Sequence, residues 1–341
     1  MRKRPPRRPQ GSSKHPTLND VAEIVGVSPS TVSRAMSSPG RVSKHTLERI
    51  EAAVAKIGFV PNLLAGGLAS NRSHLIAFIV PSISLMMFNE SVQLIVGELS
   101  EAGYRPLLMH SRKTRPEMDK AMIDVLSLRP DGIIIMGADL SDAARERLTR
   151  RRLPVVEVWD MPDDPIDMVA GFSHKQVGRT IGEYLIRRGY QRPLLVWATG
   201  SRAVTMQESL SYVFVHSGLA PPPVRGCKFP PDFTDGREAM HAALAMQPRP
   251  DVVVCLSDWA AHGAVVEARR QNQRVPQDIA VMGFGDFDFA SQLEPPLTTV
   301  RINQAQLAKA ATDCLLQRLR GAEPADRVVN VQATLIERES A

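Results

Sequence analysis

Residues 17–60 place apolar and polar side chains at helical spacing in three short segments. Thr17 and Asp20 form a variant of the capping box, which satisfies free amide groups at the start of a helix. Ser28 caps the second segment, and Pro29 takes its first helical position, where a missing amide hydrogen costs nothing. The pattern therefore predicts a short helix, a glycine turn and a second helix.

A third helix is predicted after Ser43, which stands at its N-cap position. The apolar residues expected to pack the three helices together are Val21, Ala22, Ile24, Val25, Val27, Val32, Leu47, Ile50, Ala53, Val54 and Ile57. Outward-facing hydroxyl and guanidinium groups on the second helix suit base edges and phosphates. The three helices therefore predict a DNA-binding head. The alternative is a helical bundle in which these polar groups are only solvated surface.

Residues 61–72 predict a hinge. Pro61 and Asn62 can start a helix, but the two turns that follow contain two glycines and would be marginal alone. Leu68 is the apolar side chain available to wedge between base steps of a minor groove. A segment that orders only on DNA could link the state of the remaining chain to DNA affinity. The alternative is a flexible tether.

From residue 73 to residue 341, apolar runs alternate with amphipathic stretches, which is typical of parallel sheets covered by helices. The expected strands cover residues 75–80, 106–109, 132–136, 155–159, 194–197, 252–256 and 279–284, and the expected helices of the second half cover 175–188, 235–245 and 259–270. Two doubly wound lobes follow from this pattern. Ligands of such sheets bind where the carboxyl ends of the strands meet.

Residues 17–70 resemble the head and hinge of the lactose-repressor (LacI) family of bacterial regulators, through the motifs TLNDVAEIVGVSPSTVSRAMS and RVSKHTLERIEAAVAKIGFVPN and a hinge ending in GLA. RPDGIIIMG, LPVVEVWD and CLSDWAAHGAVVEARRQNQRVPQDIAVMGFGD are similar to the family's sensor domain. The resemblance implies an all-α helix-turn-helix head and an α/β, two-lobed, periplasmic-binding-protein-like sensor domain. The chain would cross between the lobes near Gly171, near residues 296–299 and after a helix over residues 303–320.

The residues expected to contact DNA are Thr17, Ser28, Pro29, Ser30, Thr31, Ser33, Arg34, Asn62 and Leu68. The resemblance implies that Pro29, Ser30 and Arg34 lie at the positions that read the major groove, and that Leu68 is similar to the family's intercalating leucine. Because Pro29 has no polar side chain, Ser30 and Arg34 would carry more of the direct readout. A symmetric dimer would bind a near-palindromic operator.

The effector-binding candidates, chosen by their positions after strands, are Ser82, Phe88, Trp159, Arg202, Met206, Ser257, Asp258, Gly285 and Gln304. The alternative for each is an ordinary packing or capping role, with Ser257 a cap for the helix that follows. Many family members carry an arginine where Met206 stands and an aspartate where Gly285 stands. A neutral disaccharide or a purine held by those groups is therefore not expected.

LPVVEVWD followed by DMVAGF, together with SRKTRPEMD, is most similar to the family's gluconate-utilisation repressors. The resemblance favours release from DNA by a sugar acid such as gluconate. A carboxylated sugar needs cationic or amide-rich partners, and the candidates are Arg202, His174, Lys175 and Lys113. The alternative is that these charges are solvated surface groups.

The net charge of +6 in 341 residues is concentrated in residues 1–16, which hold six basic and no acidic residues. This proline-rich arm is expected to be disordered and to attract phosphates without specificity, or to act only as a solubilising tail. Cys227, Cys255 and Cys314 are widely separated, which favours reduced thiols. No cofactor and no metal site is expected.

Two rival classes of function share parts of this pattern. A periplasmic sugar-binding protein would need an export signal, which the N-terminus lacks, and would not need residues 17–70. An α/β enzyme would need a phosphate loop or a catalytic set, and residues 283–285 lack the third glycine of a dinucleotide loop. We therefore expect a cytoplasmic regulator that is not an enzyme. The chain stops five residues after Ile336, with no leucine-heptad tail, which favours a dimer.

Overall fold

The computed structural model describes residues 16–60, 72–80, 86–110, 115–137, 140–198, 201–229 and 231–341. The chain divides into two compact units, Met1–Ser73 and His74–Ala341. The basic arm up to residue 15, the hinge with Asn62 and Leu68, and the candidates Ser82 and Lys113 lie outside the described residues. The predictions made for them stay predictions.

The first unit is a helical head. Its elements are α1 (Leu18–Val25), α2 (Pro29–Ser37), the 3₁₀ turn η1 (Pro39–Arg41) and α3 (Lys44–Ile57). The core consists of Val21, Ala22, Val25, Val32, Ala35, Ile50, Ala53 and Phe59. Gly26 ends α1 with a left-handed φ of 72°, which glycine adopts without a steric penalty. The predicted helices and caps are confirmed.

One apolar assignment in the head is wrong. Ile24 is 51% exposed, whereas Val21, Ala22 and Val25 of the same helix are buried. These three positions form a narrow stripe, and Ile24 falls outside it on an eight-residue helix. The end of α1 is held instead by Arg49 of α3, whose Nη2 donates to the carbonyl oxygen of Val25 at 2.6 Å.

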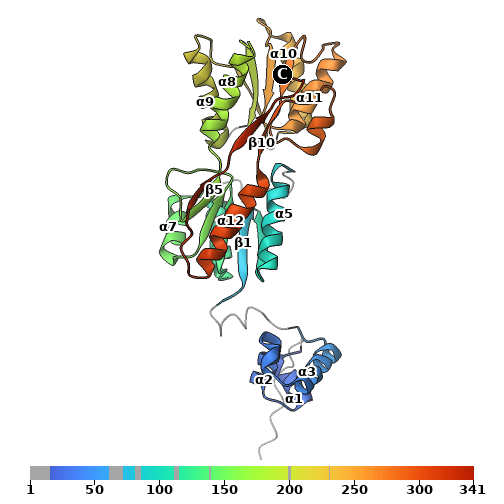
Figure 1. The fold of residues 1–341 in the computed structure, drawn as a ribbon, viewed down its shortest axis with the longest axis vertical. Helices are drawn as coiled ribbons and strands as arrows, with labels where there is room; N and C mark the ends of the chain where they lie inside the picture. Colours follow the sequence, from blue (N-terminus) through green and yellow to red (C-terminus); the bar gives the residue numbers. More distant parts are fainter. Residues whose placement is uncertain are drawn as a thin grey trace, which may run out of the picture. The chain divides into compact units, whose positions relative to one another are not determined.

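The second unit contains two α/β lobes (Figure 1). Lobe 1 contains β1 (Leu75–Val80), α5 (Met86–Glu101), β2 (Arg105–His110), α6 (Arg115–Ser127), β3 (Gly132–Met136), α7 (Asp142–Arg151), β4 (Val155–Val158), β5 (Met168–Gly171), α12 (Gln304–Leu319) and β11 (Val328–Asn330). Its parallel sheet has the order β11-β5-β4-β3-β1-β2.

The central strands β1, β3, β4 and β5 of lobe 1 bury both faces. Ile76 and Phe78 pack with residues of α5 and α12, while Ala77 and Ile79 pack with residues of α6 and α7. Successive side chains of a strand point to opposite faces, so a continuous apolar run such as residues 75–80 serves two helical layers. Figure 1 shows α5 and α12 together on one face of the sheet.

Lobe 2 contains α8 (His174–Arg187), β6 (Pro193–Ala198), α9 (Ser201–His216), β7 (Val224–Cys227), α10 (Phe233–Ala245), β8 (Val252–Cys255), α11 (Asp258–Arg270), β9 (Ala280–Met282) and the 3₁₀ turn η2 (Asp288–Gln292). Its parallel sheet has the order β7-β6-β8-β9. Helices α8 and α9 pack together, as do α10 and α11. The two doubly wound lobes are therefore confirmed.

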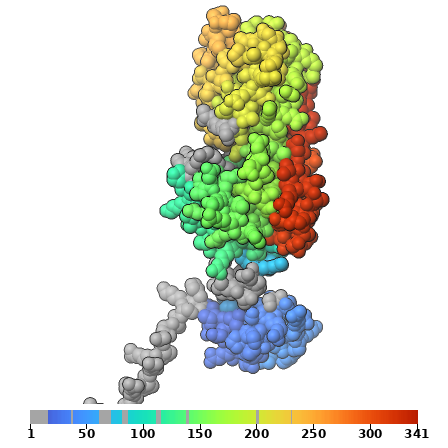
Figure 2. All heavy atoms as spheres, turned by 90° about the vertical axis from the view of Figure 1, so that its left-hand side faces the viewer, coloured from blue at the N-terminus to red at the C-terminus, as the bar shows by residue number. Residues whose placement is uncertain are grey.

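The chain crosses between the lobes three times, near the positions that the resemblance implied. The first crossing follows Gly171. The second runs along β10 (Thr299–Ile302), and the third runs along β12 (Ala333–Ile336), which pairs antiparallel with β10. Ala341 then lies buried in lobe 2, where its carbonyl oxygen accepts a hydrogen bond from the Tyr184 hydroxyl. Figure 2 shows the C-terminal residues, in red, along one side of both lobes.

No helix within the described ranges combines the length and the apolar character that a membrane span requires.

A substitution at Gly171 tests the close approach of two backbone segments at the first crossing. A Cβ atom built on Gly171 would lie 1.9 Å from the carbonyl oxygen of Asp160, which is backbone and cannot move aside easily. We expect Gly171→Ala to lower the free energy of unfolding by more than about 2 kcal/mol, because it forces two backbones apart. Urea unfolding followed by circular dichroism measures the effect.

Gly226→Ala is the matched control, since a Cβ on Gly226 would meet nothing within 4 Å. Equal stability of Gly171→Ala and Gly226→Ala would contradict the close approach of the two segments at the crossing.

Candidate functional site

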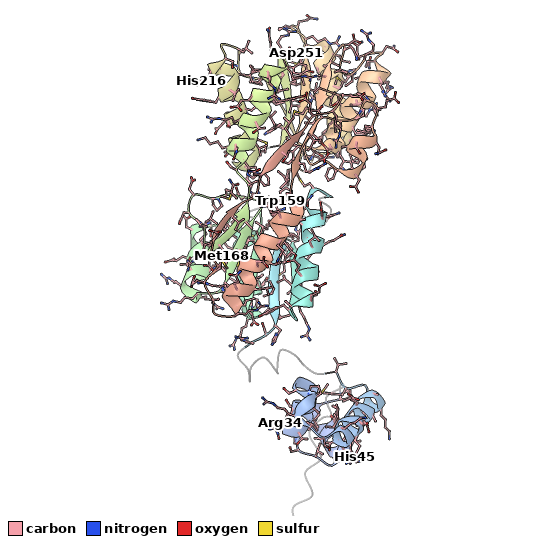
Figure 3. All side chains as sticks on the ribbon, viewed as in Figure 1. Arg34, His45, Trp159, Met168, His216 and Asp251 are labelled. Carbon is pink, nitrogen blue, oxygen red and sulfur yellow. The ribbon has the colours of Figure 1, made fainter. Side chains whose placement is uncertain are left out.

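Helix α2 presents one polar face to solvent. Val32 and Ala35 are buried in the core of the head, and they leave Pro29, Ser30, Ser33 and Arg34 exposed on the other side, with Thr31 half-buried. Figure 3 labels Arg34 on this helix. Pro29 and Ser30 lie one helical turn before Ser33 and Arg34. The four exposed residues therefore form a narrow strip along α2, which can enter a major groove.

Caps fix the starts of α1 and α2. The Ser28 hydroxyl accepts a hydrogen bond from the amide of Thr31 at 3.2 Å and lies 2.8 Å from the Ser30 hydroxyl. At α1, the amide and the hydroxyl of Thr17 both donate to one carboxylate oxygen of Asp20, at 2.7 and 2.8 Å. These two bonds lower the pKa of Asp20. The hydroxyls of Thr17 and Ser28 are thus already engaged in holding helix ends.

Three candidates from the sensor meet around Ser91 of α5. The indole Nε1 of Trp159 donates to the Ser91 hydroxyl at 3.0 Å, and the Gln304 side chain accepts from the Ser91 amide at 3.0 Å. The rings of Phe88 and Trp159 meet edge to face, with centroids 4.5 Å apart. The sequence placed Phe88, Trp159 and Gln304 near one site, and these contacts bring them together. Figure 3 shows Trp159 where the two lobes meet.

An ion pair joins the lobes beside Trp159. Arg202 of α9, in lobe 2, donates from Nε to Oδ2 of Asp160, which follows β4 in lobe 1, at 2.6 Å. The guanidinium also lies against the end of β3, because a Cβ on Gly137 would come within 2.8 Å of Nη1. Gly137 therefore leaves room for the arginine to reach across two strand ends of lobe 1.

His174 adds a third titratable group to this pair. Its Nδ1 lies 3.6 Å from Oδ1 of Asp160, and its ring packs against Phe172 with centroids 4.6 Å apart. Burial lowers the pKa of His174 to about 4, and the charge of Arg202 acts in the same direction, against the attraction of Asp160. At neutral pH the imidazole is therefore uncharged, and Arg202 is the cation of this cluster.

Asp258 forms a separate cluster in lobe 2. Its Oδ1 accepts from the Thr299 hydroxyl at 2.6 Å, and its Oδ2 accepts from the Phe287 amide at 2.9 Å. Burial raises its pKa to about 6 in spite of these two bonds. Gly285 adjoins the cluster with a φ of 129°, facing the Phe287 ring. The contacts of Asp258 fasten β10 to lobe 2.

Among the remaining effector-binding candidates, Ser257 and Met206 have structural roles. Ser257 caps α11 by accepting from the amide of Trp259 at 3.2 Å. Met206 is 1% exposed, and its carbonyl oxygen would lie 2.1 Å from a Cβ on Gly178, which marks the close packing of α8 and α9. Lys175 is exposed at the start of α8. Contact of any of these residues with an effector stays a prediction.

Sequence reasoning missed three residues that organise the site. Asp160 directly follows a predicted strand, so the rule that ligands meet strand ends could have found it. Ser91 lies inside α5, where no motif marks it. Asp286 binds Arg301 and Arg338 at 2.5 and 2.7 Å. Its partners are far along the chain, so only the fold reveals them.

Known proteins share both units of the chain. Residues 17–62 match the family described as bacterial regulatory proteins, lacI family, and residues 183–341 match the family described as periplasmic binding protein-like domain. The HTH-type transcriptional regulator GntR of Pseudomonas aeruginosa is 30% identical over 330 residues, which cover 95% of each chain. The ribose operon repressor of Escherichia coli is 28% identical over 331 residues, covering 95% of this chain and 99% of the repressor.

Solved structures agree with these relatives. A LacI-family transcriptional regulator from Silicibacter pomeroyi superposes with a TM-score of 0.88 at 30% identity, over 95% of this chain and 98% of that one. A lac repressor dimer bound to operator and an anti-inducer gives a TM-score of 0.82 at 27% identity, over 96% and 99% of the two chains. The chain belongs to the LacI family of bacterial regulatory proteins. It is a DNA-binding transcriptional regulator whose relatives are regulators rather than enzymes.

The exposed face of α2 leads to a first prediction. If Arg34 pairs with a guanine, Arg34→Ala should relax the preference for that base by about 1 to 3 kcal/mol, because a bidentate contact distinguishes bases. Selection of duplexes from a random pool by the two proteins measures the preference. A uniform loss of affinity for all sequences would instead assign Arg34 to a phosphate.

The buried imidazole of His174 leads to a second prediction. The folded protein holds this group at a pKa of about 4, below its ordinary value of 6.5. Between these values the unfolded chain binds more protons, so the free energy of unfolding should fall as the pH drops from about 6.5 toward 4. Urea titrations across this range should show a smaller fall for His174→Gln, which cannot be protonated. An identical pH dependence in the two proteins would contradict the burial of a neutral imidazole.

Proposed function

We propose that this regulator represses genes for the use of a sugar acid such as gluconate. It binds a near-palindromic operator as a symmetric dimer in the cytoplasm, and the sugar acid, held between the lobes, releases it. The observation that carries the proposal is the guanidinium of Arg202 at the lobe junction, 2.6 Å from Asp160.

The chemistry of Arg202 suits a carboxylate. A guanidinium carries five N–H donors in a planar fork, so it can keep Asp160 and still bind a second carboxylate. A half-buried guanidinium binds more strongly than one in water because less solvent screens it. The side chain of Arg202 is 29% exposed. These properties support an effector with a negative charge.

A second part of lobe 2, around Gly285, supports the same class of effector. The family resemblance implies an aspartate in many members at the position of Gly285, and the neighbouring Asp258 carboxylate is bonded to Thr299 and Phe287. Gly285 has no side chain, so a neutral sugar that such an aspartate binds in other members of the family would lack this contact here. The regulator GntR of Escherichia coli is 28% identical and IdnR is 26% identical. Because the ribose operon repressor is equally similar at 28%, overall identity does not choose the effector. The charge at the junction favours an acid.

An exposed apolar surface on lobe 1 supports the dimer. Leu94 of α5, Leu107 and Leu108 of the edge strand β2, Ile123 of α6 and Leu128 directly after α6 are each between 36% and 50% exposed. Apolar side chains gathered on neighbouring elements often mark an interface with another protein chain. A second copy of this chain is the occupant that an operator with two half-sites requires.

Ligand control of DNA binding follows from linkage. An effector that binds one arrangement of the lobes better than another shifts the population toward that arrangement. Lobe 1 is joined directly to the hinge and the head, so its position relative to a dimer partner sets the spacing of the two heads. A coupling of about 1 to 3 kcal/mol would change operator affinity by roughly 5-fold to 150-fold.

Arg202 provides the test. Arg202→Gln should weaken gluconate binding by roughly 10-fold to 150-fold, because a hydrogen bond to a charged group contributes about 1.5 to 3 kcal/mol. Isothermal titration calorimetry of the full-length protein with gluconate measures the change. Arg179→Gln, which removes an exposed charge from α8 of the same lobe, is the matched control and should bind as the wild type does.

Two results would overturn the proposal. The first is equal gluconate affinity of the Arg202→Gln and wild-type proteins. The second is binding of ribose by the wild-type protein with no binding of gluconate or ketogluconates.

A further inference from the structure

A row of basic residues borders the amino-terminal edge of the lobe 1 sheet. His74 immediately precedes β1, Arg105 begins β2, Arg129 lies three residues before β3, and Arg152 lies three residues before β4. All four side chains are exposed. Within the described ranges, the guanidinium groups of the three arginines make no hydrogen bond or ion pair. The three guanidinium groups are therefore positive charges without a partner among the described residues.

The sheet register brings these residues together. Leu75 pairs with Arg105, Ile76 pairs with Gly132, and Ile133 pairs with Val155, so the four strands begin at nearly the same level. The strand order β4-β3-β1-β2 places the basic residues in the order Arg152, Arg129, His74, Arg105. Neighbouring strands lie about 4.8 Å apart, so the row is roughly 14 Å long.

Three of the four residues adopt a backbone conformation that a bulky side chain disfavours. The φ values of His74, Arg129 and Arg152 are 54°, 51° and 50°. Arg152 is the C-cap of α7, a position that glycine usually fills. An arginine costs about 1 kcal/mol more than glycine in the left-handed region. Arginine occupies a left-handed position at two successive helix-to-strand turns, where glycine would be less strained. This repetition indicates that the positive charge has a function.

The dipoles of α6 and α7 offer a simpler explanation for the arginines at these positions. The experiment must distinguish this explanation from contact with DNA. A cation near the C-terminus of a helix interacts favourably with its dipole, and Arg129 and Arg152 follow α6 and α7. Nearby acids reduce the positive charge in part, since Asp131 accepts from the amide of His74 at 2.9 Å and Glu101 is exposed at the end of α5. A dipole contribution would appear in stability and would leave DNA affinity unchanged.

The length of the chain between the head and β1 limits how far this edge can lie from DNA bound by the head. Residues 61–74 connect the described end of the head to β1, and fourteen residues span at most about 50 Å. β1 begins at the same edge that carries the basic row. A duplex presents one phosphate charge per about 1.7 Å of its axis. A row of roughly 14 Å can therefore face several phosphates at once.

We propose that Arg105, Arg129 and Arg152, with His74 among them, form a second DNA-contacting surface of this regulator. The row binds phosphates of the duplex that the head reads, and it contributes affinity without sequence preference. The proposal rests on DNA binding by the head and is independent of the identity of the effector.

The test compares full-length protein with the triple variant Arg105→Gln, Arg129→Gln and Arg152→Gln. The probes are a duplex of about three helical turns selected by the wild-type protein from a random pool, and an unselected duplex of the same length. Dissociation constants are measured by fluorescence anisotropy between about 50 and 200 mM salt. The slope of log affinity against log salt should become less steep by about 0.9 for each phosphate that the variant no longer neutralises. The decrease in affinity should be similar on both duplexes.

A lobe 2 variant controls for total charge. Arg179→Gln, Arg225→Gln and Arg270→Gln together remove the same charge from exposed positions, and this protein should keep the wild-type slope. A triple Arg→Lys variant of the row retains the charge and should also keep it. The three single Gln variants of the row replace the triple variant if it does not fold.

An unchanged slope in a folded Gln variant would overturn the proposal. A lower melting temperature with the wild-type slope would overturn it too, because the arginines would then only stabilise helix ends.

Discussion

The ion pair between Arg202 and Asp160 connects the two lobes of the sensor at the point where their strands end. Each group comes from a loop or helix that follows a strand, and the two groups belong to different lobes. The pair therefore breaks if the lobes move apart at this point. A half-buried charge needs a partner. In the proposed function, a carboxylate that binds Arg202 would compete with Asp160 for the guanidinium. The neighbouring His174 is neutral, which leaves Arg202 as the cation of this cluster.

The crossing strands restrict how the lobes can move. Asp286 holds Arg301, which lies within β10, and Arg338, which follows β12. Asp258 holds Thr299 at the start of β10. These bonds fasten both strands to lobe 2, so a change of lobe angle must be taken up closer to lobe 1. Lobe 1 follows residues 61–73 in the chain, so in the proposed function such a change would reach the head through this segment.

Capping residues and hydrophobic spacing were sufficient to predict the head and most strands. They were insufficient to predict the contacts of the candidate site. Capping and spacing placed α1 to α3 correctly, and continuous apolar runs gave β1 and β3 with their observed bounds. The short strands β5, β7, β10, β11 and β12 were missed because so few residues carry too little periodicity. Positions after strands pointed to Trp159 and Arg202, but their partners Ser91 and Asp160 depend on packing between distant segments. Met206 is buried where α8 and α9 pack together, and its contact with an effector stays a prediction.

Operator affinity with and without effector tests the control of DNA by the lobes most directly. Anisotropy of a duplex selected by the full-length protein would be measured in the absence of gluconate and at saturating gluconate. We expect gluconate to weaken operator binding by roughly 5-fold to 150-fold, as a coupling of about 1 to 3 kcal/mol requires. Gluconate that binds the protein and leaves operator affinity unchanged would contradict the coupling between the lobe junction and the DNA-reading head.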